Sequence, residues 1–223
     1  MDECSQIAFR EMTTAGLEYA GRVCSQHGWF IDMGFPAAPA PQVAELYEQG
    51  NGDRADSLLI DYYRERYPSI RDALVNCYRE RATLLNKGFH MHDNGEYDVS
   101  VPLLLIQADG ICSSVFGREF FRVKGNGLAA RKSVEQRTVD WIWNAAAEPF
   151  RTIVPIAAPR RTSKSLNRHL VLHGRSLDYG TEMNSLKAIS LLAFLHGLDA
   201  YSRERRQAIQ FNEPWPESEQ TAV

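Results

Sequence analysis

Apolar residues recur every three to four positions along most of this chain, which is the spacing of one face of an α-helix. The pattern is clearest over residues 98–116, and over a stretch that begins at Asp178 or Thr181 and ends near Arg206. No segment shows sustained two-residue alternation bounded by turn residues. The sequence therefore predicts an all-α fold, and short connections favour a helical bundle. Further helices are expected over residues 5–24, 41–50, 53–67 (ending before Pro68), 69–89 and 133–147.

The sequence pattern divides the chain into three regions. Residues 1–94 are an N-terminal helical region of unknown role, residues 95–206 form the bundle, and residues 207–223 are expected to be a frayed tail. Within the first region, the stretch HGWFIDMGFPAAPAP is too rich in Gly and Pro to continue a helix. It is the best candidate for a hinge or internal linker.

Several classes of protein are excluded by composition. The first residues, MDECSQIAFREM, carry acids where a signal peptide needs positive charge, and no apolar run approaches the roughly 20 residues that span a bilayer. We therefore expect a cytoplasmic protein with reduced thiols, no membrane contact and no cofactor. No CxxC pair suggests a zinc ribbon or redox motif among the widely spaced Cys4, Cys24, Cys77 and Cys112.

A metal site has one weak indication. His90 and His92 precede Asp93 in FHMHDNGE, but a zinc site needs at least one more donor and none is signalled nearby. The end of a helix explains these residues without a metal.

Charge is distributed unevenly between the two halves of the chain. Residues 1–100 hold 16 acids and 9 bases, a net charge of −7, whereas residues 101–223 hold 12 acids and 16 bases, a net charge of +4. No acid lies between Glu148 and Asp178. We expect a strong positive potential there, because the stretch contains Arg151, Arg160, Arg161, Lys164, Arg168 and Arg175.

Arg168 and His173 lie in this acid-free stretch and are the side chains best suited to catalysis. A guanidinium binds phosphate, and an imidazole exchanges protons near neutral pH. Together they suit phosphodiester cleavage without a metal. Spacing alone is weak evidence, because Arg22 and His27 repeat it. Alternatively, His173 followed by Gly174 ends a helix, and Arg168 pairs with an acid.

The segment NRHLVLHGRSLDYGTEMNSLKAISLLAFL, with the earlier YDVSVPLLLIQADGI, resembles the HEPN superfamily of helical nucleases. The resemblance leaves residues 1–94 unexplained. It implies a homodimer that cuts RNA without metal, with Arg168 as phosphate binder and His173 as acid/base residue. Members often carry a polar residue directly after the arginine; here that residue is His169, a possible substitute, while Asn167 precedes the arginine.

Further residues are candidates for supporting roles. Asp109 borders the apolar stripe of residues 98–116 and is expected either to orient His173 or Arg168 or to pair elsewhere. Gln107 is expected in solvent. Thr181 and Asn184 have the spacing of an imperfect capping box, and Tyr179 either stacks on a base or packs in the core or an interface. The residues expected to bind RNA are Arg160, Arg161, Lys164, Arg175 and Tyr179.

Three functions from different classes follow from these features. The first is a metal-independent endoribonuclease acting in phage defence, a toxin–antitoxin system or RNA turnover, with RNA, a second copy of the chain and an antitoxin or regulator as partners. The second is a helical module that binds RNA or an acidic protein without cleavage. The third is a structural or regulatory subunit without RNA affinity.

Overall fold

The structure is a computed structural model that describes residues 3–138, 140–158 and 166–210. Within these ranges the predicted all-α bundle is confirmed, since helices are interrupted only by loops and one short antiparallel hairpin. The hairpin pairs β1 (Val123–Lys124) with β2 (Gly127–Leu128), and 3-10 turns lie at η1 (Arg79–Arg81), η2 (Glu148–Phe150) and η3 (Pro155–Ala157). The helices are α1 (Glu3–Gln26), α2 (Ala40–Glu48), α3 (Gly52–Cys77), α4 (Ala82–Asp93), α5 (Tyr97–Phe116), α6 (Arg131–Glu135), α7 (Trp141–Ala146), α8 (Arg168–Leu172) and α9 (Glu182–Gln210).

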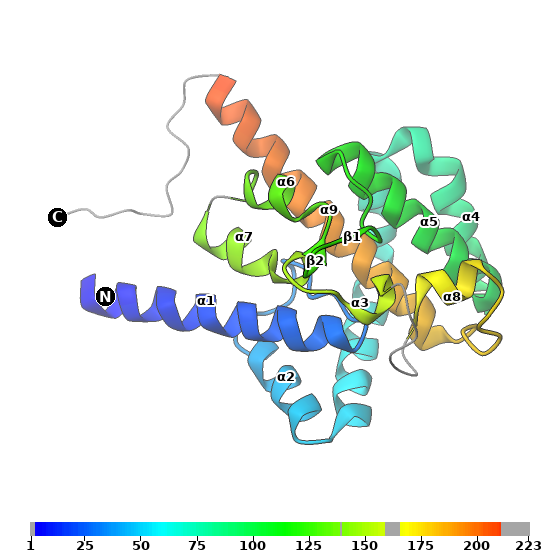
Figure 1. The fold of residues 1–223 in the computed structure, drawn as a ribbon, viewed down its shortest axis with the longest axis horizontal. Helices are drawn as coiled ribbons and strands as arrows, with labels where there is room; N and C mark the ends of the chain where they lie inside the picture. Colours follow the sequence, from blue (N-terminus) through cyan, green and yellow to red (C-terminus); the bar gives the residue numbers. More distant parts are fainter. Residues whose placement is uncertain (1–2, 139, 159–165, 211–223) are drawn as a thin grey trace.

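The central helix of the fold is α9, which runs diagonally through the molecule in Figure 1. The sequence predicted this position from a broad apolar face, and that face is buried at Leu186, Ile189, Leu192, Leu195 and Leu198. Both α3 and α5 pack along α9, and α4 packs on α5. On the other side, α1 packs on α2 and α7. The helix continues to Gln210, past the point where the frayed tail was expected, and residues 211–223 lie outside the described ranges.

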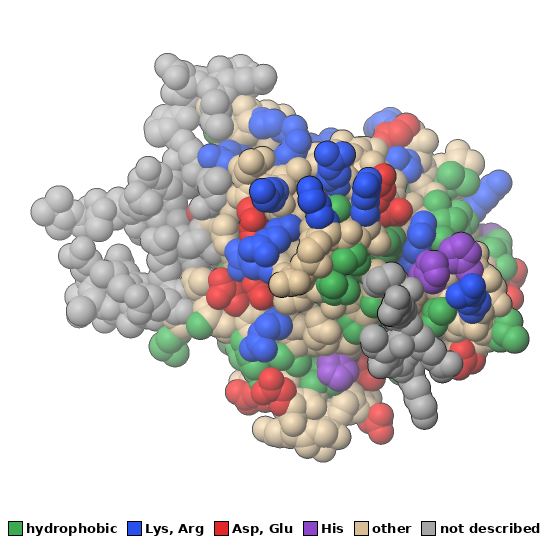
Figure 2. All heavy atoms as spheres, in the orientation of Figure 1, with side chains coloured by type: hydrophobic (Ala, Val, Ile, Leu, Met, Phe, Trp, Pro, Cys, Tyr) green, Lys and Arg blue, Asp and Glu red, His purple; other side chains and the backbone are tan. Residues whose placement is uncertain are grey.

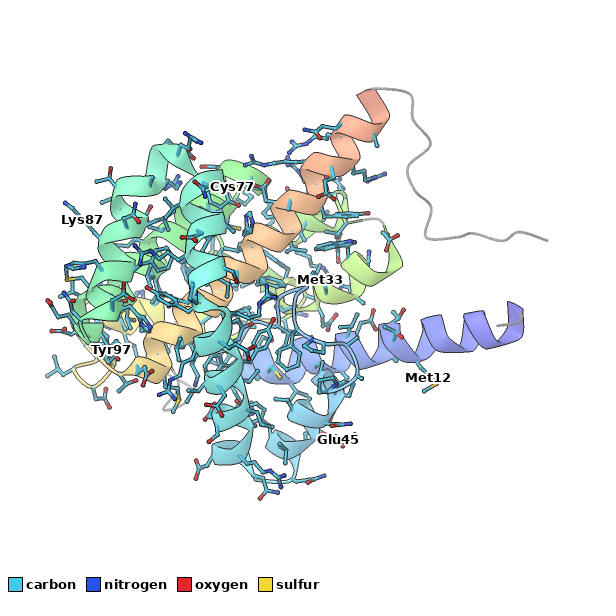
Figure 3. The ribbon with its side chains drawn as sticks, turned by 180° about the vertical axis from the view of Figure 1, so that it is seen from behind. Met12, Met33, Glu45, Cys77, Lys87 and Tyr97 are labelled. Atoms are coloured by element: carbon cyan, nitrogen blue, oxygen red, sulfur yellow. The ribbon has the colours of Figure 1, made fainter. Side chains whose placement is uncertain are left out.

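One continuous hydrophobic core contains side chains from residues 1–94 and from residues 95–206. Phe30, from the N-terminal region, packs its ring against Phe120 and Phe194, and Phe150 packs on the same two rings. Figure 3 shows the molecule from behind, with Cys77 at the end of α3 and Tyr97 at the start of α5. The N-terminal region therefore packs against the bundle over a shared core.

The stretch HGWFIDMGFPAAPAP, predicted to be a hinge or linker, enters this core, so that prediction was wrong. Trp29, Phe30 and Ile31 are buried. The indole N–H of Trp29 donates to Asp56, and the backbone N–H of Phe30 donates to the hydroxyl of Ser190 in the central helix. Gly and Pro prevent helix formation here without preventing burial, because the apolar run WFI finds partners far away in the sequence.

The long helix α3 passes through Pro68, although the sequence predicted two helices separated at that residue. Proline removes one backbone donor and crowds the preceding turn, which opposes a helix interior. Here Pro68 is exposed, while Tyr63, Ile70 and Leu74 on both sides of it are buried. Packing of both halves on the core therefore holds one continuous helix.

The helix predicted over residues 133–147 is two short helices, α6 and α7. Thr138, just beyond the end of α6, is buried, and its N–H and hydroxyl both donate to the carbonyl oxygen of Val134. In α7, the ring of Trp143 stacks on Tyr201 of α9 at a centroid distance of 4.6 Å, so it packs against the central helix. The side chain of Trp141 lies outside the described part.

Of the described helices, α5 alone is long and apolar enough to cross a membrane, whereas the sequence analysis expected no such segment. Just over half of it is buried against neighbouring helices, and core helices of soluble proteins pass the same test. Gln107 in α5 was expected in solvent but is only 1% exposed. Its side-chain oxygen lies 3.5 Å from a guanidinium nitrogen of Arg81, which explains how a polar side chain is buried there.

Candidate functional site

The short helix α8 carries the residues to which the sequence analysis assigned catalysis, and Asn167 is its N-cap. The side-chain oxygen of Asn167 accepts a hydrogen bond from the N–H of Leu170 at 3.1 Å. Its amide nitrogen donates to the carbonyl oxygens of Pro155 at 2.8 Å and Ala158 at 3.0 Å. Asn167 therefore anchors the start of α8 to the η3 turn. Its amide is fully engaged in structural contacts.

His173 ends α8, as the helix-terminating alternative predicted. Its N–H bonds to the carbonyl oxygen of His169, and Gly174 follows with φ at +65°, a conformation that suits glycine at a helix C-terminus. The imidazole ring of His173 remains exposed to solvent. The backbone of His173 therefore helps to end the helix, while its side chain stays accessible.

The imidazole rings of His169 and His173 form a pair on one face of α8. They lie one helical turn apart in sequence, and their ring centroids are 4.3 Å apart. Figure 2 shows histidine side chains gathered at the surface over this helix. Partial desolvation lowers the pKa of His169 below 6.5, and the positive charges of His173, Arg175 and Arg168 lower it further. His169 is thereby held in its neutral, proton-accepting form more strongly than a free imidazole.

Arg168 points toward α5 and belongs to a different cluster. Its Nη2 lies 3.7 Å from Oδ2 of Asp109, and its guanidinium carbon lies 5.5 Å from the ring centre of Phe121. The other carboxylate oxygen of Asp109 accepts the N–H of Phe121 at 3.2 Å. Nε of Arg168 is buried and has no hydrogen-bond partner within the described ranges. Asp109 therefore positions Arg168, which is one of the two roles considered for it.

The expected pair of Arg168 and His173 does not form as a direct contact. Five positions along a helix turn the side chains about 140° apart, whereas four positions bring them onto the same face. His173 consequently meets His169, and Arg168 meets Asp109. The spacing of four between the two histidines was the signal in the sequence that indicates this pair. No sequence signal pointed to Phe121.

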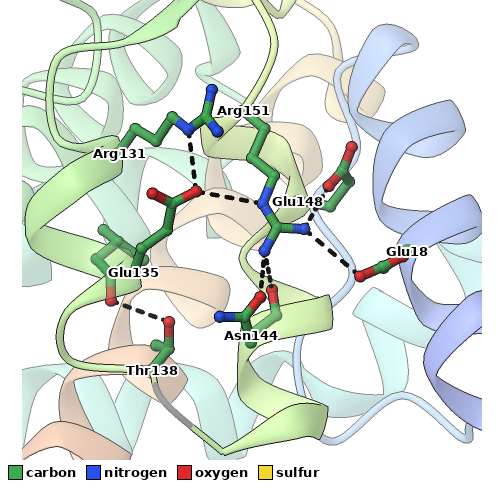
Figure 4. Close-up of polar contacts among 8 residues, drawn as sticks. Glu18, Arg131, Glu135, Thr138, Asn144, Glu148 and Arg151 are labelled. Atoms are coloured by element: carbon green, nitrogen blue, oxygen red, sulfur yellow. Dashed lines mark hydrogen bonds and ion pairs between the residues drawn. The ribbon is translucent and has the colours of Figure 1, made fainter.

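Arg151, another base of the acid-free stretch, is neutralised by acids from other elements. Its guanidinium contacts the carboxylates of Glu148, Glu135 and Glu18 at 2.8, 3.4 and 3.5 Å (Figure 4). It also donates to the side chain and backbone oxygens of Asn144. Arg151 thus joins α1, α6 and α7 around one positive charge, and it contributes little to the predicted surface potential.

The other bases predicted to bind RNA have different positions. Arg175 follows α8 and is exposed. Three further residues fall outside the described ranges, so their predicted role stays a prediction: Arg160, Arg161 and Lys164. The positive potential expected near α8 therefore comes, within the described part, from Arg175 and from the partly exposed Arg168.

Tyr179 is tied into the loop that leads to α9. Its hydroxyl donates to the carbonyl oxygen of Asp98 at 2.9 Å, and its own carbonyl oxygen accepts from the side chain of Asn184 at 2.9 Å. The ring packs against the core, which agrees with the packing alternative. The N–H of Asn184 donates to the hydroxyl of Thr181 at 3.2 Å, so the predicted cap of the last helix is confirmed.

The residues considered for a metal point in different directions. The Nδ1 atom of His92 lies 2.8 Å from the hydroxyl of Ser185, while His90 contacts the side chain of Asn94. The carboxylate of Asp93 accepts from Tyr67 at 2.6 Å and contacts Arg71 at 3.3 Å. In the described part of the chain, no group of three or more His, Cys, Asp or Glu side chains is arranged to hold a metal ion.

Comparison with protein-family models, with curated proteins and with solved structures finds no match to this chain.

Proposed function

We propose that this chain is a metal-independent endoribonuclease whose acid and base are the paired imidazoles of His169 and His173. The observation that carries the proposal is their ring separation of 4.3 Å at an exposed surface, beside Arg175. The resemblance of this segment to the HEPN superfamily supports the same activity. Asp109 and Phe121 hold Arg168 at the base of α8, so its charge is fixed in place.

The chemistry requires two proton transfers at one phosphate. His169, which is held neutral, removes the proton of the ribose 2′-hydroxyl, and the resulting oxygen attacks phosphorus. The bond from phosphorus to the 5′-oxygen breaks, and protonated His173 gives its proton to that oxygen. The products are a 2′,3′-cyclic phosphate and a free 5′-hydroxyl. Arg175, which is exposed beside the two rings, stabilises the negative charge that builds on the phosphate oxygens.

A second copy of the chain would double the catalytic groups around one phosphate. Leu177, in the loop after α8, is 91% exposed and is the apolar side chain nearest in sequence to this helix that a second copy could cover. We include a homodimer in the proposal, acting on RNA in the cytoplasm in defence, toxin–antitoxin control or turnover, with an antitoxin or regulator as a further partner.

A direct cleavage assay tests the enzyme. The wild-type chain, incubated with end-labelled mixed-sequence RNA in excess EDTA, is expected to release fragments ending in 2′,3′-cyclic phosphate. Replacing His173 with Ala or His169 with Ala is expected to lower the rate by a factor of about 10² or more, the usual contribution of a general acid or base. His90→Ala serves as the control, because His90 is exposed on α4 and distant in sequence from α8.

A binding module without activity is the second candidate, favoured by the engagement of Arg168 with Asp109. It predicts RNA affinity that is unchanged in the His169→Ala and His173→Ala variants, and no cleavage by any of the proteins. Cleavage by the wild type that both alanine variants retain in full would reject the proposed site. RNA left intact by the wild type over a range of substrates would reject the enzyme.

A further inference from the structure

We infer that the β1–β2 hairpin and α6 form a docking surface for the phosphate backbone of single-stranded RNA, leading the strand to α8. This inference rests on the proposed function. The segment from residue 118 to residue 137 holds six bases and two acids, a net charge of +4. Figure 2 shows Lys and Arg side chains gathered over α6 and the hairpin, on the same face as the histidines of α8. The six bases are Arg118, Arg122, Lys124, Arg131, Lys132 and Arg137.

The hairpin is a rigid support for these charges. The side chain of Leu128 in β2 is buried, while Lys124 in the facing strand is exposed. A Cβ atom at Gly127 would lie 2.9 Å from the carbonyl oxygen of Phe150 and 3.0 Å from that of Arg151, so the strand sits directly on that backbone. A fixed support lowers the entropy lost when a phosphate binds, because the charges are already in place.

Some bases on the long helices are paired with acids, whereas three of the six bases of this surface, all exposed, are not. On α3, Arg64 binds Glu182 through two hydrogen bonds of 2.7 Å, and Arg71 contacts Asp93 at 3.3 Å. Arg118, Lys124 and Lys132 are exposed and have no acid partner within the described ranges. Their charge is therefore available to an external polyanion.

The surface is physically joined to α8. Phe121 directly precedes Arg122, and its N–H donates to Asp109, whose second oxygen contacts Arg168. The guanidinium of Arg168 also lies over the ring of Phe121. The segment that leads into the hairpin therefore lies against Arg168, at the start of the helix that carries the two imidazoles. Phosphate contacts hold a strand without reading its bases, so this surface predicts binding with little sequence preference.

The test measures binding separately from cleavage. The full-length chain is titrated into a fluorescent 2′-O-methyl RNA, which lacks the attacking hydroxyl and cannot be cut, and anisotropy is recorded at several salt concentrations. The double variant Lys124→Glu/Lys132→Glu is expected to bind about tenfold or more weakly. Its dependence of log K on log salt concentration is expected to be shallower by about 1.4, or 0.7 for each lost phosphate contact on a single strand.

A charge-matched control uses bases outside the surface. Arg54 on α3 and Lys87 on α4 are exposed, and Figure 3 shows Lys87 on the outer side of α4 in the view from behind. The variant Arg54→Glu/Lys87→Glu changes the net charge equally and is expected to keep at least half of the wild-type affinity. Lys124→Gln/Lys132→Gln, which removes charge without reversing it, is expected to give an intermediate loss and guards against misfolding of the glutamate variant.

The outcomes separate the two proposals. Equal weakening by the hairpin and control variants overturns the docking surface, because the effect would then follow net charge alone. Unchanged RNA affinity in the hairpin variants also overturns it, and the surface would then suit an acidic protein instead. A wild type that cuts RNA while the hairpin variants cut with the same KM leaves the nuclease standing without this surface. Tight binding of the uncleavable RNA with no cleavage of ordinary RNA rejects the nuclease and keeps the surface.

Discussion

The imidazole rings of His169 and His173 lie 4.3 Å apart, one turn from each other on α8, at the surface of an otherwise well-packed bundle. Asn167 caps the start of this helix and Gly174 follows its end, so the two rings are presented by a short and well-anchored element. The geometry provides two proton-exchanging groups at one place. Desolvation and the neighbouring positive charges lower the pKa of His169, which favours it as the base of the pair.

Arg175→Gln is expected to raise the pKa of His169 toward 6.5, because the charge of Arg175 contributes to lowering it. The acidic limb of the pH–rate profile should then move to higher pH, since a base with a higher pKa loses its neutral form earlier as the pH falls. NMR titration of the ring Cε1–H measures the shift. A pKa that stays constant or falls in the variant contradicts the electrostatic account.

Two substitutions at Asp109 separate its ion pair from its hydrogen bond. Asp109→Asn loses the charge facing Arg168 but keeps an oxygen that accepts the N–H of Phe121, and it should cost about 1 kcal/mol of unfolding free energy. Asp109→Ala also leaves that N–H without its acceptor and should cost roughly 1–3 kcal/mol. Urea unfolding monitored by circular dichroism gives both values. Equal losses in the two variants would show that the hydrogen bond contributes nothing measurable.

Asn167→Ala is expected to lower the unfolding free energy by roughly 1–3 kcal/mol, because it removes an N-cap and two donors to backbone carbonyl oxygens. Asn167→Asp keeps the capping oxygen but places a negative charge against the carbonyl oxygens of Pro155 and Ala158, so it should not rescue the loss. Thermal and urea unfolding provide the comparison. Full stability of the aspartate variant would mean that the cap alone matters.

Arg151→Met is expected to destabilise the fold by roughly 2–4 kcal/mol, because it removes the cation bound to the largely buried carboxylate of Glu148. Arg151→Lys keeps the charge but not the forked set of donors, and should recover only part of the loss. Urea unfolding measures both, with Arg122→Met as the control. Arg122 is exposed and contacts Glu119 at 3.9 Å, so its replacement should cost at most about 0.5 kcal/mol.

The stability of the protein is expected to fall as the pH falls below 6.5. Burial lowers the pKa of His92 and of His196, and the acids near them offset this only in part. Unfolded imidazoles gain protons first as the pH falls through 6.5, so protons favour the unfolded state until the folded pKa is passed. Above 6.5 this effect is absent. Unfolding free energies at pH 7.5 and 5.5 test the sign, and His92→Gln should reduce the difference.

Much of the helical architecture could be predicted from the sequence, because helix periodicity and end signals are local. The helix over residues 98–116 and the central last helix were predicted close to their observed bounds. The break expected at Pro68 and the linker expected after His27 were wrong for a common reason. Proline and glycine disfavour a helix only through local backbone effects. Burial of Tyr63, Leu74 and Trp29 against distant helices decided whether these segments form part of the packed fold.

What the sequence by itself determined is the set of amphipathic helices, the signals that begin and end α8, and the spacing that places two histidines on one face. Only the tertiary structure decided that Arg168 meets Asp109 and Phe121, that acids from three elements neutralise Arg151, and that the bases of the β1–β2 hairpin are presented on the same face as α8. The physical reason is the distance along the sequence over which each kind of interaction acts. Periodicity and capping act between residues a few positions apart, whereas ion pairs and burial join residues that the folded chain brings together from far apart in the sequence.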